Sequence, residues 1–169
     1  MNRATVIGPD LRARREVTAT NQFFSVLVLE WPSSLVANGN VPRSGVALHF
    51  LSVDDDDMRI TRSFGPESLP PRRYDFPRLW QVLTPSAGGF WAASVSRYHL
   101  TRWTSDGRLL ASLTRDPAWF ENTGATGIGT PTQPPPPAIT AVHEDDEGLL
   151  WVFVRVPGRT WREGWPHAS

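Results

Sequence analysis

The stretch GGFWAASVSRYHLTRWTSDGRLLASLTR, residues 88–115, decides the fold of this chain. It contains short runs in which apolar and polar residues alternate, and Asp106-Gly107 stands at the turn before the last run. Alternation with a period of two, interrupted by turn residues, predicts antiparallel β-strands. Together with the run that precedes it, the stretch predicts strands at 78–84, 90–95, 98–104 and 108–114. The five residues 85–89, with two glycines, predict the first hairpin loop of this four-stranded sheet.

The same pattern recurs along the chain. Turns centred on Asp10, Asp56 and Asp106 lie about fifty residues apart, each between two strand-like runs. A second register supports the repeat, because Trp91 and Trp151, each three residues after a glycine, are 60 residues apart. Repeats of this length with four short strands each are typical of β-propellers.

The predicted fold is therefore all-β, with propeller blades of four antiparallel strands and about three and a half blades in an open arc. We expect one partial propeller domain over residues 1–169, with blade portions at approximately 1–20, 21–65, 78–115 and 138–156. A closed propeller has roughly four to eight blades. The chain is thus expected to be a fragment whose end blades expose apolar faces and self-associate, or which unfolds easily.

Within these portions the strands are assigned from apolar runs and breakers. Residues 22–30 form a nearly continuous apolar run, which predicts an inner strand buried on both faces. Residues 31–44 contain Pro32, Asn38-Gly39 and Pro42, which predict a loop. The remaining predicted strands are 3–7, 11–17, 45–53, 58–64, 138–144 and 149–156.

Composition limits the classes of partner. All 17 basic residues are arginine, and 17 acidic residues bring the formal net charge to zero. A neutral chain has no general field for nucleic acid, so we expect no nucleic-acid partner. No apolar stretch is long enough for a membrane span, and no signal peptide is visible. The compartment stays open: the protein is periplasmic or secreted if a signal peptide is missing upstream.

Three segments carry a family resemblance. Residues 88–115, 138–154 (AITAVHEDDEGLLWVFV) and 45–65 (GVALHFLSVDDDDMRITRSFG) resemble blades of bacterial six-bladed β-propellers of the NHL/TolB-like kind. The shared features are Asp-Gly at the turn before the outermost strand and Gly-x-x-Trp at the second strand. The resemblance implies the propeller architecture and an often exported protein, but it implies no particular ligand, because members differ widely in function.

The candidate ligand-binding residues are aromatic and basic side chains on predicted loops, which in a propeller share one rim around the channel. Exposed aromatic and arginine side chains are typical anchors of binding surfaces. One histidine, on a predicted innermost strand, is expected to line the channel. These candidates are Trp31, Arg72, Arg73, Tyr74, Trp119 and His143.

The sequence predicts no catalytic residue, metal site or cofactor. The acidic runs 54–57 and 144–147 place consecutive carboxylates in diverging directions, which is typical of solvated hairpin tips. His49 and His99 occupy equivalent third-strand positions, where we expect hydrogen bonds between blades. No serine stands in a nucleophile motif.

Three functions remain open at this stage. The favoured hypothesis is a non-enzymatic binding or scaffold module that recognises a protein or small ligand on its channel rim. One alternative is a hydrolase or lyase whose channel active site is completed by missing blades. The other is an extracytoplasmic sensor propeller.

Overall fold

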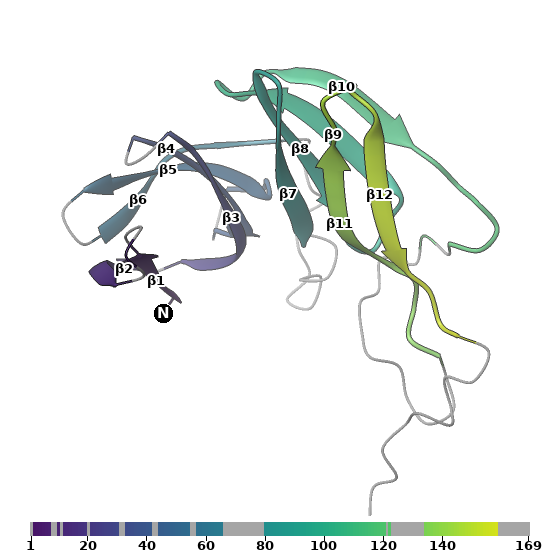
Figure 1. Ribbon diagram of the computed structural model, residues 1–169, viewed down its shortest axis with the longest axis horizontal. Coiled ribbons are helices and arrows are strands. Elements are labelled where there is room, and N and C mark those ends of the chain that lie inside the picture. Colours follow the sequence, from purple (N-terminus) through teal and green to yellow (C-terminus); the bar gives the residue numbers. More distant parts are fainter. Residues whose placement is uncertain are drawn as a thin grey trace, which may run out of the picture.

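The chain forms an all-β fold. The computed structural model describes residues 2–7, 10, 12–19, 21–30, 33–41, 44–54, 57–65, 80–120, 122 and 134–158. This part of the chain contains twelve strands and no helix (Figure 1). The strands belong to three sheets, which follow one another along the sequence.

The first sheet has six strands. They are β1 (Asn2–Ile7), β2 (Ala13–Ala19), β3 (Gln22–Glu30), β4 (Ser34–Asn40), β5 (Leu48–Asp54) and β6 (Asp57–Phe64). Strands β3 to β6 form an antiparallel meander, in which each strand pairs with the next. The prediction that residues 22–30 are an inner strand buried on both faces is wrong, because β3 lies at the edge of the sheet and Val26 and Val28 are 45% and 51% exposed. The predicted N-terminal hairpin is confirmed as β1 and β2, and it extends this sheet, because Thr18 of β2 pairs in parallel with Asp57 of β6.

The loop predicted over residues 31–44 is wrong, because Ser34–Asn40 is the buried strand β4. It pairs with β3 on one side and β5 on the other. Asn38, which suggested a turn, is fully buried: its Nδ2 donates to the Ala47 carbonyl (3.0 Å), and its Oδ1 accepts from the Gln81 N–H (2.8 Å). The side-chain amide thus has partners inside the protein, and the cost of burying it is offset.

The second sheet has the predicted four antiparallel strands. They are β7 (Gln81–Ser86), β8 (Gly89–Ser94), β9 (His99–Thr104) and β10 (Leu109–Thr114), paired in sequence order. The predicted five-residue loop is wrong, because Ser86 pairs with Gly89 and leaves a turn of only Ala87 and Gly88. Gly88 has a φ of 74°, which glycine adopts without steric cost and which lets the strands continue so close to the turn.

The third sheet contains β11 (Ala138–Glu144) and β12 (Leu150–Arg155), close to the predicted boundaries. These two strands pair antiparallel, and the described residues add no further strand to them.

The three sheets pack face to face, with β3, β7 and β11 side by side. Strand β7 contacts β3 on one side and β11 on the other (Figure 1). One buried apolar cluster joins the first two sheets, and a second joins the second and third. A third cluster lies within the first sheet, between β2 of the N-terminal hairpin and strands β4 to β6. This packing confirms the predicted all-β class, while the propeller architecture and the number of its blades stay predictions.

Candidate functional site

A polar cluster attaches the third sheet to the second. Glu144, at the end of β11, accepts a hydrogen bond from Trp91 Nε1 of β8 (2.6 Å) and pairs with Arg102 of β9 (3.2 Å). The Glu144 side chain is only 10% exposed, and the Arg102 guanidinium lies 5.8 Å from the Trp91 ring centroid. A carboxylate buried to this extent needs such charge-assisted partners. The cluster therefore holds β11, and with it β12, in one position on the second sheet.

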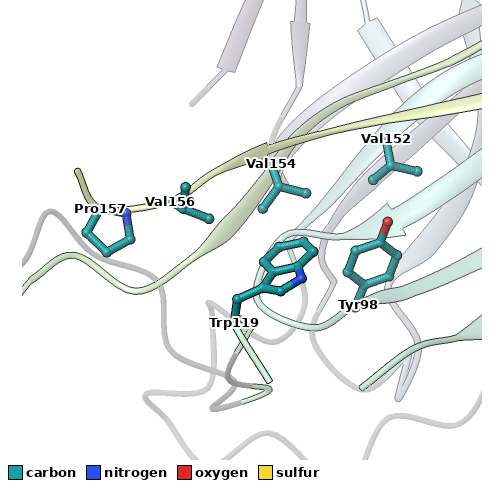
Figure 2. Close-up of a pocket in the computed structure, with 6 residues that line it drawn as sticks. All are labelled: Tyr98, Trp119, Val152, Val154, Val156 and Pro157. Atoms are coloured by element: carbon teal, nitrogen blue, oxygen red, sulfur yellow. The ribbon is translucent and has the colours of Figure 1, made fainter. Parts of the chain in front are cut away.

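An apolar groove of about 670 Å³ lies between β12 and the loop after β10 (Figure 2). One wall consists of aromatic side chains, and the other consists of side chains from β12 and the two residues that follow it. The lining residues are Tyr98, Trp119, Val152, Val154, Val156 and Pro157. None of them carries a carboxylate or an imidazole, so the groove offers apolar contact and little acid–base chemistry.

The aromatic wall of the groove is fixed by ring contacts with a buried phenylalanine and by polar side chains of the loop after β10. Tyr98 and Trp119 meet edge to face with ring centroids 6.2 Å apart, and both contact Phe120, which is 1% exposed. The Asn122 side chain accepts the Tyr98 N–H (2.8 Å), and the Arg115 guanidinium lies 5.4 Å from the Tyr98 ring centroid. The wall is thus fixed by buried packing and hydrogen bonds, although 53% of Trp119 is exposed.

The outer face of the third sheet, pointing away from the second sheet, is also apolar. Trp151 and Phe153 of β12 are more than half exposed there, and the exposed His143 of β11 pairs with Trp151 in the strand register. Trp151 Nε1 donates to Asp145 Oδ2 (2.8 Å). This bond, together with backbone N–H groups including that of Leu149, lowers the pKa of the Asp145 carboxyl below its usual value.

The structure places two of the six predicted site residues. Trp119 lines the groove, and His143 lies on the outer face of the third sheet. The other four, Trp31, Arg72, Arg73 and Tyr74, lie outside the described residues. The structure adds Tyr98, which the sequence presented only as one aromatic residue in a strand. The predicted strand 98–104 begins with Tyr98, whereas in the structure Tyr98 precedes β9, which begins at His99.

His49 and His99 form hydrogen bonds to residues of their own sheets. The prediction that their hydrogen bonds join neighbouring blades is therefore wrong for these bonds. His49 Nε2 donates to the Gly39 carbonyl (3.3 Å), which leaves Nδ1 to accept from the Ser63 hydroxyl (2.8 Å). Burial lowers the pKa of His49 and outweighs the opposite effect of the Gly39 carbonyl. His99 bonds to Ser112 (3.0 Å) on the adjacent strand, and burial also lowers its pKa.

The described residues contain no group of three or more His, Cys, Asp or Glu side chains that could hold a metal ion. The described residues of the acidic turn between β5 and β6, Asp54 and Asp57, have side chains accessible to solvent. The Arg59 guanidinium lies 3.1 Å from the Asp54 carboxylate and 3.7 Å from the Asp57 carboxylate.

The described residues define an all-β protein with an apolar groove between β12 and the loop after β10. Comparison of the chain with models of protein families, with curated proteins and with solved structures gave no match. The resemblance to six-bladed propellers of the NHL/TolB-like kind therefore stays a prediction. In the part of the chain that can be placed, no helix has the length and apolar character needed to cross a membrane.

Proposed function

We propose that this chain is a non-enzymatic binding module that recognises a segment of a partner protein in the groove between β12 and the loop after β10. The observation that carries the proposal is Trp119, which is 53% exposed in a wall fixed by Tyr98 and the buried Phe120. Tryptophan and tyrosine are enriched among the residues that dominate binding energy at interfaces.

The chemistry of the lining favours a protein segment over a small polar ligand. Small-molecule sites combine apolar walls with several convergent polar groups that fix the orientation of the ligand. Here Tyr98 and Trp119 carry the only side-chain polar atoms among the lining residues, and the opposite wall consists of Val152, Val154, Val156 and Pro157. The groove therefore fits apolar side chains of a protein partner.

A displayed library of random twelve-residue peptides tests this function. Peptides selected on the unmodified chain should bind the Trp119→Ala variant at least about tenfold more weakly, as expected for a tryptophan that anchors an interface. Trp80→Ala is the matched control, because Trp80 is also exposed (43%) but packs against Phe24, outside the groove. A selection that enriches no peptide, or peptides that bind both variants equally, would exclude the groove as the recognition site.

A further inference from the structure

We infer that the groove receives its partner segment as an extended β-strand, which pairs through its backbone with the outer edge of β12. This inference rests on the function proposed above and specifies the partner as a strand-forming segment with apolar side chains at alternate positions. Strand addition of this kind obtains affinity from main-chain hydrogen bonds and selectivity from pockets for alternate side chains.

The backbone direction along β12 carries the inference. Within the described residues β12 pairs with β11 alone. The Asp145 N–H donates to the Leu149 carbonyl (3.0 Å), so the backbone groups of Leu149 point toward the β11 side of the hairpin. Because backbone direction alternates along an antiparallel strand, Val152 and Val154 point their N–H and C=O groups away from β11, toward the outer edge.

The same two residues direct their side chains into the groove. Val152 and Val154 belong to the apolar cluster between the second and third sheets, whereas Trp151 and Phe153 face the opposite side. In an added strand, the residues opposite Val152 and Val154 would form the backbone hydrogen bonds to β12. The side chains of these same residues would point into the groove.

The second sheet continues beneath the position of such a strand. Leu100 of β9 is fully buried in the cluster between the second and third sheets, while its cross-strand neighbour Leu113 of β10 is 40% exposed. The two described strands of the third sheet thus cover β9 but leave Leu113 in contact with solvent. An additional strand beside β12, about 4.8 Å away, would cover part of this surface.

A second copy of this chain does not fit the same position through its own β12. In the second copy, the side chains of Val152 and Val154 would already pack against the second sheet of that copy. The same face of its β12 would have to lie over Tyr98 and Trp119 of the first copy. Symmetric pairing of two β12 strands would place two second sheets on one face of the joined sheet, where they overlap. The occupant is therefore a single extended segment, and the face that it turns toward Tyr98 and Trp119 is not already packed against another sheet.

The first test is an N-methyl scan of the most enriched twelve-residue peptide from the selection. N-methylation removes one N–H donor and adds bulk at that position only. Strand addition predicts a period of two: about tenfold or greater loss of affinity at every second position of the bound segment, and changes of less than about twofold at the positions between. Loss without this alternation would overturn strand pairing and leave the proposed function in place, whereas a selection that yields no peptide overturns both.

The second test changes β12 itself. Val152→Pro removes an N–H that points to the outer edge, a position where proline is tolerated in strands, and should abolish peptide binding. Val152→Thr keeps the N–H and the branched shape, so it should retain binding to within about threefold. Equal binding by both variants, with unchanged circular dichroism, would contradict the inference.

Other occupants give different results in the same assays. Dimerisation of the unmodified chain in light scattering that disappears in Val152→Pro would assign the edge to a second copy and overturn the inference. The segment that follows β12 in the sequence contains Trp161 and Trp165. A Trp161→Ala/Trp165→Ala variant that binds the peptide more than tenfold better would assign the groove to this C-terminal segment and likewise overturn the inference. A monomer whose peptide affinity is unchanged by this double substitution supports a partner segment.

Discussion

Replacing Glu144 should detach the third sheet from the second. Glu144→Ala leaves two donors without their acceptor, the Trp91 indole N–H and an Arg102 guanidinium N–H, which bond it at 2.6 and 3.2 Å. A hydrogen bond to a charged group contributes about 1.5–3 kcal/mol. Arg102 is 29% exposed and can recover water, so we take the lower value for each bond and expect a loss of about 3 kcal/mol. Glu144→Gln, which keeps an acceptor for Trp91 but not the charge, should lose about half of this.

Urea unfolding combined with hydrogen exchange measures both the size and the place of this loss. Amides of β11 and β12 should lose protection in Glu144→Ala, while those of β4 and β5, packed between the hairpin and the second sheet, keep it. A double-mutant cycle with Arg102→Met should give a coupling energy of about 1–2 kcal/mol. A loss below about 0.5 kcal/mol, or protection that falls equally in all three sheets, would refute the assigned role of the cluster.

Three further predictions concern other parts of the fold. The lowered pKa of His49 means that the folded state favours the neutral ring. The contribution of His49 to stability is therefore complete above the unfolded pKa of 6.5 and decreases as the pH falls below that value. Between pH 7.5 and 5.5 the urea midpoint should decrease less in His49→Gln than in the unmodified chain. Gly89→Ala should destabilise the chain by at least about 2 kcal/mol in urea unfolding, because the added Cβ would lie 1.9 Å from the Trp103 carbonyl oxygen. Trp151→Thr/Phe153→Thr should reduce binding of the dye ANS and light scattering, because both rings are more than half exposed; unchanged dye binding would contradict the apolar outer face.

Local patterns in the sequence were sufficient to predict the second sheet and five of the six strands of the first sheet, but not β4. In residues 88–115, alternation and turn residues agree, and all three predicted strands are present there as β8, β9 and β10. In Ser34–Asn40 they conflict, because Asn38-Gly39 suggests a turn. The conflict is resolved by partners distant in the sequence, since the backbone of Gln81, on the next sheet, donates to the Asn38 side chain. Tertiary hydrogen bonds of this kind are not visible in a local window.

The candidate site was predictable only in part, for a related reason. Trp119 could be selected because a tryptophan outside a predicted strand needs an explanation. Of its partners in the groove, Tyr98 lies between β8 and β9 and Val154 lies in β12, and only the packing of β12 against the second sheet brings Val154 to the aromatic wall. The sequence also placed Trp151 in the same repeat position as Trp91. The structure shows that the two indoles have different partners, Asp145 of the same hairpin for Trp151 and Glu144 of the next sheet for Trp91.

The attachment of the third sheet and the proposed binding of a strand must depend on each other. Glu144 positions β11 and β12 on the second sheet, and Val152 and Val154 of β12 form one wall of the groove. A segment that contacts both walls binds only the attached state, so it stabilises that state by RT ln(1 + [L]/Kd), about 2.7 kcal/mol at a concentration of 100 Kd. This energy is close to the loss expected for Glu144→Ala. The selected peptide should therefore restore hydrogen-exchange protection of β11 and β12 in that variant at about 100 Kd, and the same concentration should leave a Glu144→Ala/Trp119→Ala variant unprotected. Protection restored in both variants would show that the peptide binds outside the groove.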